Sequence, residues 1–363
     1  MTVVFYISGH GFGHASRQVE VINALAARRP DVRIAVRSSV SPALLARTIR
    51  TQSTLDPVNC DSGIVQVSSI EHDDAATLRH AIDFYRSFEG RVRAEVGALT
   101  HSNTRVIVGD IPPLAFAVAA RLELPSLAIA NFTWDWIYES HPGFDTEPWI
   151  LPLMREAYSQ ASYALALPFS GGFEVFPARE SLPLIARHAQ RSREETRAHF
   201  DIPQNRRVAL LSFGGYGLPS LDLSAIDCAR EWVIVTTDRV TGDAAPVPHV
   251  VRLIEDGLFT GGFRYEDLVA ASDMVVTKPG YGIIAECAST GTPMLYTSRG
   301  DFREYDLMVA EMPSYVRAQF ISQDDLFAGR WSAAIEALDQ IPAPPPARSD
   351  GAEIAAERIL EML

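Results

Sequence analysis

Short apolar runs alternate along the chain with segments whose apolar residues recur at helical spacing. The runs at 3–7 and 33–37 are rich in β-branched residues, a composition typical of buried strands. Residues 16–27, between them, have the 3.6-residue period of an amphipathic helix. The alternation predicts βαβ units and a mainly parallel sheet, with further strands at 64–67, 105–110, 126–131 and 163–169.

The alternation lapses in a stretch marked by glycine and proline at 170–203, and then restarts. Strand-like runs follow at 207–213, 231–238, 249–254, 274–280 and 293–298, and a long helix is expected earlier, at 75–99. The chain is therefore expected to have an α/β fold of two Rossmann-like, doubly wound domains. We place an N-terminal domain at 1–180, a linker at 181–203, a C-terminal domain at 204–345, and a last helix, expected to pack back on the N-terminal domain, at 346–363.

The bulk composition narrows the class of protein. A length of 363 residues fits two domains, because single hydrophobic cores stop growing at roughly 250 to 300 residues. The net charge of −13 argues against nucleic acid as the main partner, since phosphate binding needs a basic surface. Cys60, Cys228 and Cys287 form no metal-binding spacing, and the first apolar run is too short for a signal peptide or a membrane span. We expect a cytoplasmic protein without a transmembrane segment; its oligomeric state stays open.

The stretch SGHGFGH, at 8–14, follows the first predicted strand and combines three glycines with two histidines. Its spacing is not G-x-G-x-x-G, and the next predicted strand ends in a basic residue, which argues against a nicotinamide or flavin dinucleotide. No carboxylate or thiolate cluster nearby completes a metal site with His10 and His14, so we expect no metal here. One of these histidines is instead expected to be a general base.

Asp110 ends the predicted strand 105–110, at the same edge of the sheet as the two histidines. A carboxylate there can hydrogen-bond an imidazole ring and stabilise its protonated form. The same residue is suited to cap the helix that Pro112 and Pro113 are expected to begin, and both roles stay open.

Two glycine-rich turns follow predicted strands in the second half, in LLSFGGYG at 210–217 and in TKPGYGIIAE at 277–286. Their backbone N–H groups, and the N-terminus of the helix after the second turn, are suited to bind a diphosphate. Glu286 lies about one turn into that helix, where it can reach the sugar hydroxyls of a nucleotide. Its alternative role is that of a partner for the helix dipole.

Two further segments offer contacts for sugars. SRGDFREYD, at 298–306, places Asp301, Arg303 and Glu304 after a predicted strand, where they can bind a sugar or simply form a solvated loop. The segment 131–149 contains three tryptophans and is expected to form either an aromatic wall for an acceptor or a buried cluster.

These motifs resemble those of the GT-B glycosyltransferases, whose two Rossmann-like domains face each other across a central cleft. The resemblance covers almost the whole chain. The stretches GHGFGHASR, RSREETR, LLSFGGYG and TKPGYGIIAECASTGTPMLY are similar to the glycosyltransferase-like domain of plant L-arabinokinases and their bacterial single-domain relatives. The first loop also resembles that of the lipid I N-acetylglucosaminyltransferases. The sugar-kinase domain of the plant proteins has no counterpart here, so kinase activity is not expected.

The resemblance implies an inverting transfer of a sugar from a nucleotide-sugar donor, expected to be UDP-linked, to a small-molecule acceptor, with no cofactor required. His14 matches the base of related transferases and Asp110 its orienting carboxylate, whereas His10 has no counterpart, so the choice between the histidines stays open. The other implied roles are donor-diphosphate binding by Gly13, Gly214, Gly215, Lys278, Gly280, Tyr281 and Gly282, ribose binding by Glu286, donor-sugar binding by Asp301, Arg303 and Glu304, and acceptor contacts by His10, Phe12, Trp134 and Trp136.

Two other functions remain open from the sequence. A sugar-nucleotide epimerase can use the same architecture, because it eliminates UDP from its substrate and adds it again. A non-catalytic protein that binds a nucleotide sugar can use the same donor site.

Overall fold

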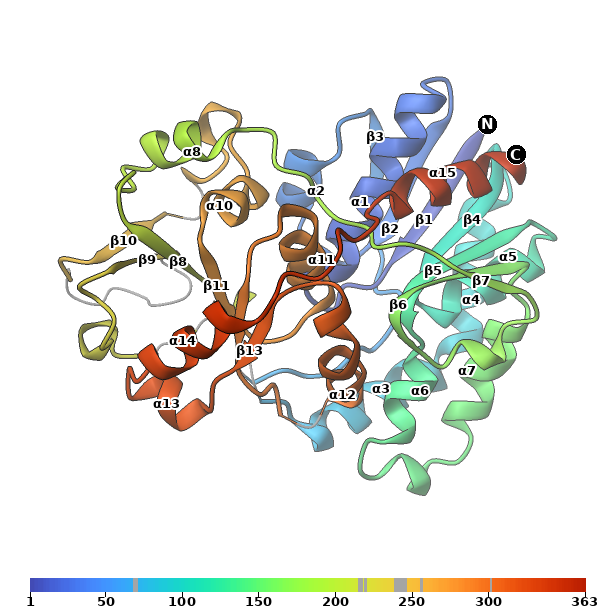
Figure 1. Ribbon diagram of the computed structural model, residues 1–363. Coiled ribbons are helices and arrows are strands. Elements are labelled where there is room, and N and C mark those ends of the chain that lie inside the picture. Colours follow the sequence, from blue (N-terminus) through green and yellow to red (C-terminus); the bar gives the residue numbers. More distant parts are fainter. Residues whose placement is uncertain (68–70, 215–217, 219–220, 238–246, 255–256, 301) are drawn as a thin grey trace. The chain divides into compact units, whose positions relative to one another are not determined.

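The computed structural model describes residues 1–363 except 68–70, 215–217, 219–220, 238–246, 255–256 and 301, and the side chains of Phe12 and Thr260 also lie outside the description. The chain forms two compact units (Figure 1). The first contains Met1–Gln66, His72–Ala186 and Ser349–Leu363, and the second is built mainly from Arg187–Arg348. Each unit is a parallel β-sheet with helices between its strands, which confirms the predicted α/β class.

The first unit has a seven-stranded sheet in the order β3-β2-β1-β4-β5-β6-β7, in which neighbouring strands run parallel. Its strands are β1 (Thr2–Ile7), β2 (Arg33–Ser38), β3 (Ser53–Pro57), β4 (Thr104–Asp110), β5 (Ser126–Phe132), β6 (Tyr163–Gly171) and β7 (Arg179–Ser181). Its helices are α1 (Gly11–Arg28), α2 (Pro42–Thr48), α3 (Asp74–Arg86), α4 (Phe88–Leu99), α5 (Pro113–Arg121), α6 (Trp134–Glu139), α7 (Ile150–Ser159) and α15 (Gly351–Glu361).

The burial of β1 explains its apolar sequence. Val3, Val4, Phe5, Tyr6 and Ile7 are all fully buried, although successive side chains of a strand point to opposite faces of its sheet. Both faces are therefore covered at β1, as is usual for a parallel sheet with crossover helices. A strand with two covered faces has a continuous apolar run rather than an alternating one.

The second unit has a six-stranded sheet in the order β10-β9-β8-β11-β12-β13, also with parallel neighbours. Its strands are β8 (Arg207–Ser212), β9 (Trp232–Thr237), β10 (Val250–Leu253), β11 (Met274–Thr277), β12 (Met294–Tyr296) and β13 (Ala318–Phe320). Its helices are α8 (Arg193–His199), α10 (Tyr265–Ala271), α11 (Tyr281–Thr290), α12 (Arg303–Glu311), α13 (Gln323–Phe327) and α14 (Ser332–Gln340).

Two sequence predictions in the first unit are wrong. The described residues 64–67 form no strand and contain only one end of an isolated bridge, from Gln66 to His72. The strand beside β2 is β3 instead, which lies at the edge of the sheet and has mostly exposed side chains, so that it lacks a hydrophobic signal. The long helix expected at 75–99 is two helices, α3 and α4, which Ser87 separates.

The last helix of the chain belongs to the first unit. α15 packs against α1, and the Gly351 N–H donates to the Leu184 carbonyl (3.0 Å). The segment 181–203, expected to be a linker, is divided between the two units. Its second part contains α8, where the guanidinium of Arg197 is buried and donates to the Ala271 carbonyl (2.9 Å). Residues after the division point are therefore folded into the second unit rather than free.

α1 has 18 residues and is the longest helix in the described part of the chain. It carries charged side chains along its length, Arg17 and Glu20 among them. Among the helices that the structure describes, none combines the length and apolar character needed to cross a bilayer.

Candidate active site

His14 lies in the first turn of α1, just after the carboxyl end of β1. This helix begins at Gly11 rather than at residue 16 as predicted, and His10 is the residue that precedes it. Gly11 has a φ of 72°, which residues with a side chain rarely adopt. A Cβ atom at Gly9 would lie 2.0 Å from the Ser39 hydroxyl oxygen. These two glycines therefore permit the short turn that brings His14 to the edge of the sheet.

Asp110 is the last residue of β4, the strand beside β1. The Ser8 N–H donates to the Asp110 carbonyl (2.8 Å), which ties the ends of the two strands together. His14 Nδ1 lies 2.8 Å from Asp110 Oδ1, and both side chains are buried. The structure thus brings together the two residues that the sequence analysis paired.

A buried arginine joins this pair. Arg17 Nη2 donates to Asp110 Oδ1 (2.6 Å), and Arg17 Nη1 donates to Asn131 Oδ1 (2.7 Å). Gln18 Nε2 donates to Asp110 Oδ2 (3.0 Å). Burial works to raise the pKa of Asp110, but the positive charge of Arg17 and the hydrogen bonds from Arg17 and His14 outweigh it and hold that pKa below its ordinary value. Asp110 is therefore an ionised carboxylate with hydrogen bonds to both oxygens. We use the term His14 network for the five residues His14, Asp110, Arg17, Asn131 and Gln18.

The ring nitrogen Nδ1 of His14 has two charged neighbours at the same distance. It lies 2.8 Å from Asp110 Oδ1, which only accepts, and 2.8 Å from Arg17 Nη2, which only donates. If Nδ1 carries the ring proton, it donates to Asp110, and Nε2 keeps its lone pair. If Nδ1 accepts from Arg17, Nε2 carries the proton in the neutral ring and has no lone pair for a base. The tautomer therefore decides what His14 can do.

Three members of the His14 network were not predicted from the sequence. Arg17 and Gln18 follow His14 by three and four residues, the spacing that places side chains on one face of a helix. This spacing predicts the contact only when His14 is known to lie within α1. Asn131 lies near the end of β5, beside β4, so its only signal is its place at the carboxyl end of a strand.

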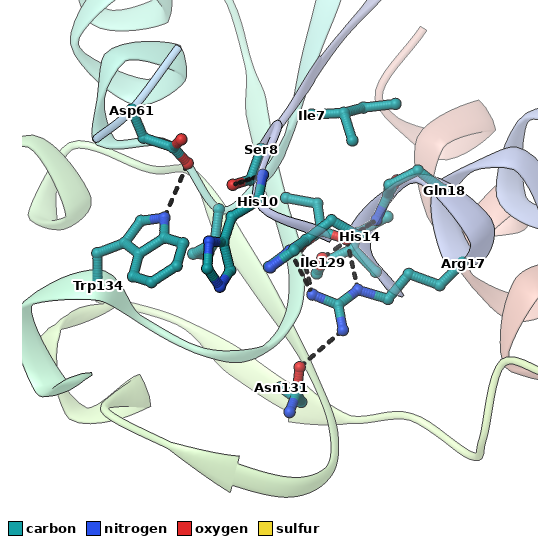
Figure 2. Close-up of polar contacts among 12 residues, drawn as sticks. Ile7, Ser8, His10, His14, Arg17, Gln18, Asp61, Ile129, Asn131 and Trp134 are labelled. Carbon is teal, nitrogen blue, oxygen red and sulfur yellow. Dashed lines mark hydrogen bonds and ion pairs between the residues drawn. The ribbon is translucent and has the colours of Figure 1, made fainter. Parts of the chain in front are cut away.

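His10 has a different environment. Its Nδ1 accepts a hydrogen bond from the Ile64 N–H (3.3 Å), so the proton of the neutral ring lies on Nε2. Its ring packs edge-on to Trp134, with centroids 5.3 Å apart (Figure 2). In this arrangement His10 can donate a hydrogen bond to a ligand but offers no free lone pair. The geometry therefore favours His14 as the base.

The two tryptophans expected on the acceptor side lie in different places. Trp134 is buried, with its ring centroid 6.0 Å from that of His14. Trp136 packs against the end of β6, since a Cβ atom at Gly171 would lie 2.6 Å from its ring. The side chain of Phe12 lies outside the described residues. Of the expected aromatic residues, Trp134 is the one placed beside His14.

Asp61 is a second buried carboxylate near this edge, and the sequence analysis missed it. Its Oδ2 accepts from Trp134 Nε1 (2.8 Å). Burial raises the pKa of Asp61, while hydrogen bonds from the hydroxyl of Ser8 and the indole of Trp134 act in the opposite direction. No local pattern marks this residue, because a contact far along the chain brings it to the site.

The glycine turns of the second unit follow β8 and β11. Gly214 has a φ of 68°, and Gly215 lies outside the described residues. α11 begins directly after Gly280, and in the described chain no side chain caps its N-terminus. A Cβ atom at Gly280 or Gly282 would meet no atom within 4 Å, and the same holds for Gly13 in α1. The backbone at these turns is therefore open to close approach.

Glu286 is buried in α11 and already has a partner. Arg187 Nε donates to Glu286 Oε1 (2.6 Å), and Arg187 Nη1 lies 3.5 Å from Glu266 Oε2. The first turn of α11 contains no acidic residue, so Glu286 stands too far along the helix to pair with its N-terminal dipole as the alternative supposed. Arg187 was not foreseen, because it lies in the segment expected to be a linker.

Lys278 follows β11 and is the one lysine of the chain. Burial and the nearby charge of Arg299 lower its pKa to about 7, against the opposite effect of Glu304. At neutral pH the amine is therefore partly uncharged. A bound phosphate would favour its charged form. Tyr281, the first residue of α11, is buried three residues farther along the chain.

The residues expected to hold the donor sugar are only partly described. Asp301 lies outside the described residues. Arg303 is the first residue of α12 and is half-buried, and Glu304, beside it, is buried and forms an ion pair with Arg299. The solvated-loop alternative is therefore wrong for Glu304.

Sequence comparison finds relatives of two kinds, although no protein-family model matches the chain. An L-arabinokinase of Arabidopsis thaliana is 26% identical over 366 residues, which cover 99% of this chain and 34% of that protein. A UDP-N-acetylglucosamine–N-acetylmuramyl-(pentapeptide) pyrophosphoryl-undecaprenol N-acetylglucosamine transferase of Clavibacter michiganensis is 24% identical over 316 residues, which cover 82% of this chain and 76% of that one. The chain thus spans about a third of the length of the L-arabinokinase. Both relatives expected from the motifs are found.

Solved structures similar to this one are glycosyltransferases. The glycosyltransferase of kitacinnamycin has a TM-score of 0.67 at 17% identity and covers 100% of this chain and 99% of its own. The spinosyn rhamnosyltransferase has a TM-score of 0.62 at 12% identity and covers 100% of this chain and 96% of its own. These likenesses, together with the sequence relatives, support a transferase. The chain has the GT-B glycosyltransferase fold, as the resemblance of its motifs implied.

Proposed function

We propose that the protein transfers a sugar from a nucleotide sugar, with UDP as the expected nucleotide, to a hydroxyl group of a small-molecule acceptor, with inversion. The observation that carries the proposal is the buried contact between His14 and Asp110 at the carboxyl edge of a sheet in a GT-B fold. The Clavibacter relative, named as an N-acetylglucosamine transferase, adds support from sequence.

In the proposed step, His14 Nδ1 carries the ring proton and donates to Asp110, which leaves the lone pair of Nε2 for the acceptor hydroxyl. Nε2 takes the hydroxyl proton as the acceptor oxygen attacks the anomeric carbon. The carboxylate of Asp110 then stabilises the imidazolium. Arg17 fixes the carboxylate in place through its own hydrogen bonds.

The bond between the anomeric carbon and the diphosphate oxygen breaks in the same step, and the nucleoside diphosphate leaves with the electron pair. Attack from the opposite face inverts the anomeric carbon. Two groups of backbone donors are suited to stabilise the developing negative charge: the N-terminus of α11, which no described side chain caps, and the backbone after β8. The charged form of Lys278 would stabilise it further. The step therefore needs no metal ion.

The remaining contacts follow from the same scheme. Glu286 accepts hydrogen bonds from the ribose, and Asp301, Arg303 and Glu304 bind the donor sugar. On the acceptor side, the neutral His10 ring offers an N–H donor, and Trp134 offers an apolar face.

A thermal-shift screen of the whole chain against UDP, GDP, ADP and dTDP tests the donor site. A nucleotide that binds only the folded state raises the free energy of unfolding by roughly RT ln(1 + [L]/Kd). The melting temperature rises as a result. We expect a shift with UDP. A protein that responds to none of the four nucleotides contradicts the proposal.

Product analysis then separates transfer from its alternatives. With the UDP-sugar that binds and a panel of hydroxylated acceptors, we expect a glycosylated acceptor of inverted anomeric configuration and free UDP. A new sugar nucleotide formed without any acceptor identifies an epimerase instead. Donor binding without turnover for any acceptor identifies a binding protein.

His14→Ala tests the base. Turnover should fall by about 10²- to 10⁴-fold, the usual contribution of a general base, while donor affinity stays unchanged. His101→Ala is the matched control, because His101 is exposed in the same unit. Equal turnover in the two variants would show that His14 is not the general base.

A further inference from the structure

His72 and Asp74, at the start of α3, meet His141, which lies much farther along the chain, and the three lie outside the His14 network. Asp74 Oδ1 lies 3.0 Å from His72 Nε2 and 2.9 Å from His141 Nδ1. One ligand atom from each of the three residues lies within 4.8 Å of the other two. Two imidazole nitrogens and a carboxylate oxygen therefore converge on one point in the first unit.

Backbone hydrogen bonds hold each of the three residues in place. His72 forms an antiparallel bridge with Gln66, and the next N–H, of Asp73, donates to the Val65 carbonyl (2.8 Å). Asp74 is the first residue of α3. The N–H of His141 donates to the Tyr138 carbonyl (3.0 Å) at the end of α6. The cluster is thus built on fixed backbone.

The contact between Asp74 and His141 joins two buried atoms, Asp74 Oδ1 and His141 Nδ1, which lie 2.9 Å apart. A carboxylate oxygen and an imidazole nitrogen at this distance form an ion pair when the ring is protonated. When the ring is neutral, the lone pair of the nitrogen and those of the oxygen are spaced to share one cation.

We propose that His72, Asp74 and His141 bind one divalent transition-metal ion, with Zn²⁺ as a suitable example. Imidazole nitrogen and carboxylate oxygen are ligands of this class of ion, at bond lengths of about 2.0 to 2.2 Å. Two such ligands lie about 3 Å apart at the 90° angle of an octahedral ion and about 3.4 Å apart at the tetrahedral angle that Zn²⁺ prefers. The two contacts of Asp74 measure 3.0 and 2.9 Å, so a small adjustment of the side chains would admit the tetrahedral ion. Water would complete the coordination.

Such an ion would link the start of α3 to the end of α6. A series of ring contacts runs from there to the candidate active site: the ring centroid of Tyr138 lies 6.4 Å from that of His141 and 5.7 Å from that of Trp134. Trp134 in turn lies 5.3 Å from His10. The ion would therefore hold the aromatic side of the site in position, without taking part in sugar transfer.

Zinc titration of the chelator-treated, full-length protein against a chromophoric competitor tests the site. We expect about one tight equivalent in the wild type and a loss of affinity of about 10- to 100-fold or more in His72→Ala and in Asp74→Asn, since each removes one ligand. His80→Ala is the matched control, because His80 is exposed on the same helix, α3. Zinc should also raise the melting temperature of the wild type by several degrees, and of the His72→Ala variant much less.

Cobalt substitution checks the ligand set independently of affinity. Co²⁺ in the wild type should give visible d–d absorption that His141→Ala and His72→Ala lose and His80→Ala keeps. His72 lies in a half-buried position ahead of α3, so its variant remains informative even if His141→Ala fails to fold. Weak zinc binding in the wild type, or equal zinc affinity in the wild type and His72→Ala, overturns the proposal and leaves an ion-pair cluster only.

Discussion

The carboxyl edges of the two sheets hold their charged side chains in different ways. In the first unit, His14, Arg17 and Asp110 are buried and bonded to one another, and in the proposed tautomer Nε2 of His14 is left for a substrate. In the second unit, Arg187 donates a hydrogen bond to Glu286, and burial together with the charge of Arg299 lowers the pKa of Lys278 to about 7. The first site is arranged before any substrate binds. In the proposed donor site, the second would exchange internal contacts for contacts with its ligand.

This difference fits the two tasks that we propose. Stabilising charge that develops during reaction is most effective when the surrounding dipoles and charges are already in position. In the proposed donor site, by contrast, two charged side chains have contacts that a donor can alter. Arg187, shared between Glu286 and Glu266, and Lys278, whose charge a phosphate would restore, are both able to respond to a ligand.

The largest expected effect lies in the first unit. Asp110→Asn removes the charge that holds Nδ1–H of His14 and stabilises the imidazolium, so turnover should fall by about 10²- to 10⁴-fold with little change in donor affinity. Steady-state kinetics and calorimetry measure the two quantities. Asp56→Asn is the control, since Asp56 is a half-exposed carboxylate of the same sheet. A similar loss in both variants shows that the effect comes from the fold.

The next effect is on stability. Arg17→Met leaves the carboxylate of Asp110 buried without its cation and should lower the free energy of unfolding by about 3 to 5 kcal/mol. Arg121→Met breaks an exposed ion pair with Glu89 and should cost only about 0 to 1 kcal/mol. Urea denaturation of the two variants gives both values. If Arg17→Met costs no more than Arg121→Met, the His14 network is not a tightly coupled unit.

In the second unit, Glu286→Gln should weaken donor binding about tenfold, because a charged acceptor for the ribose hydroxyls is lost. Glu266→Gln removes the other carboxylate that contacts Arg187 and should leave donor affinity nearly unchanged. Calorimetric titration with UDP-glucose distinguishes them. An equal loss in both variants means that Glu286 serves only to hold Arg187.

The smallest expected effect is a pH dependence. Lys278 is charged below its pKa of about 7, and the charged form binds a diphosphate, so donor affinity should fall by about three- to tenfold between pH 6.5 and pH 8. Lys278→Arg stays charged and should give a nearly flat profile. Because Lys278 is the one lysine of the chain, ¹³C-methylation of amines lets NMR follow its titration directly. A titration near pH 10 contradicts the burial that we ascribe to this amine.

Patterns that depend on sheet topology could be predicted from the sequence. Two parallel strands end at the same edge, so the strand assignments predicted that Asp110 meets one of the two histidines of the first loop. The resemblance to known transferases pointed to His14 rather than His10. The continuous apolar run of β1 was equally informative, because both faces of that strand are covered. The two glycine-rich turns that we propose to bind the diphosphate likewise follow strands, β8 and β11. Gly215, in the first of them, lies outside the described residues.

Contacts that depend on long-range packing could not be predicted. Arg187 contacts Glu286 across 99 residues of chain. His141 and Asp74 are also far apart in the sequence, and no local pattern marks either contact. β3 was missed because an edge strand with exposed side chains has no apolar signal. The contact of Arg17 with His14 was not predicted, because the helix was expected to start two residues after His14. With the true start of α1, the spacing of the two residues is helical.

The central claim is that Asp110 keeps the ring proton of His14 on Nδ1, so that Nε2 is the base. ¹⁵N NMR of the histidine rings, with the His14 signals assigned through His14→Gln, tests it most directly, because ¹⁵N shifts distinguish the two tautomers of a neutral ring. We expect a protonated Nδ1 and an unprotonated Nε2 in the neutral form. A protonated Nε2, with Nδ1 accepting from Arg17, would contradict it.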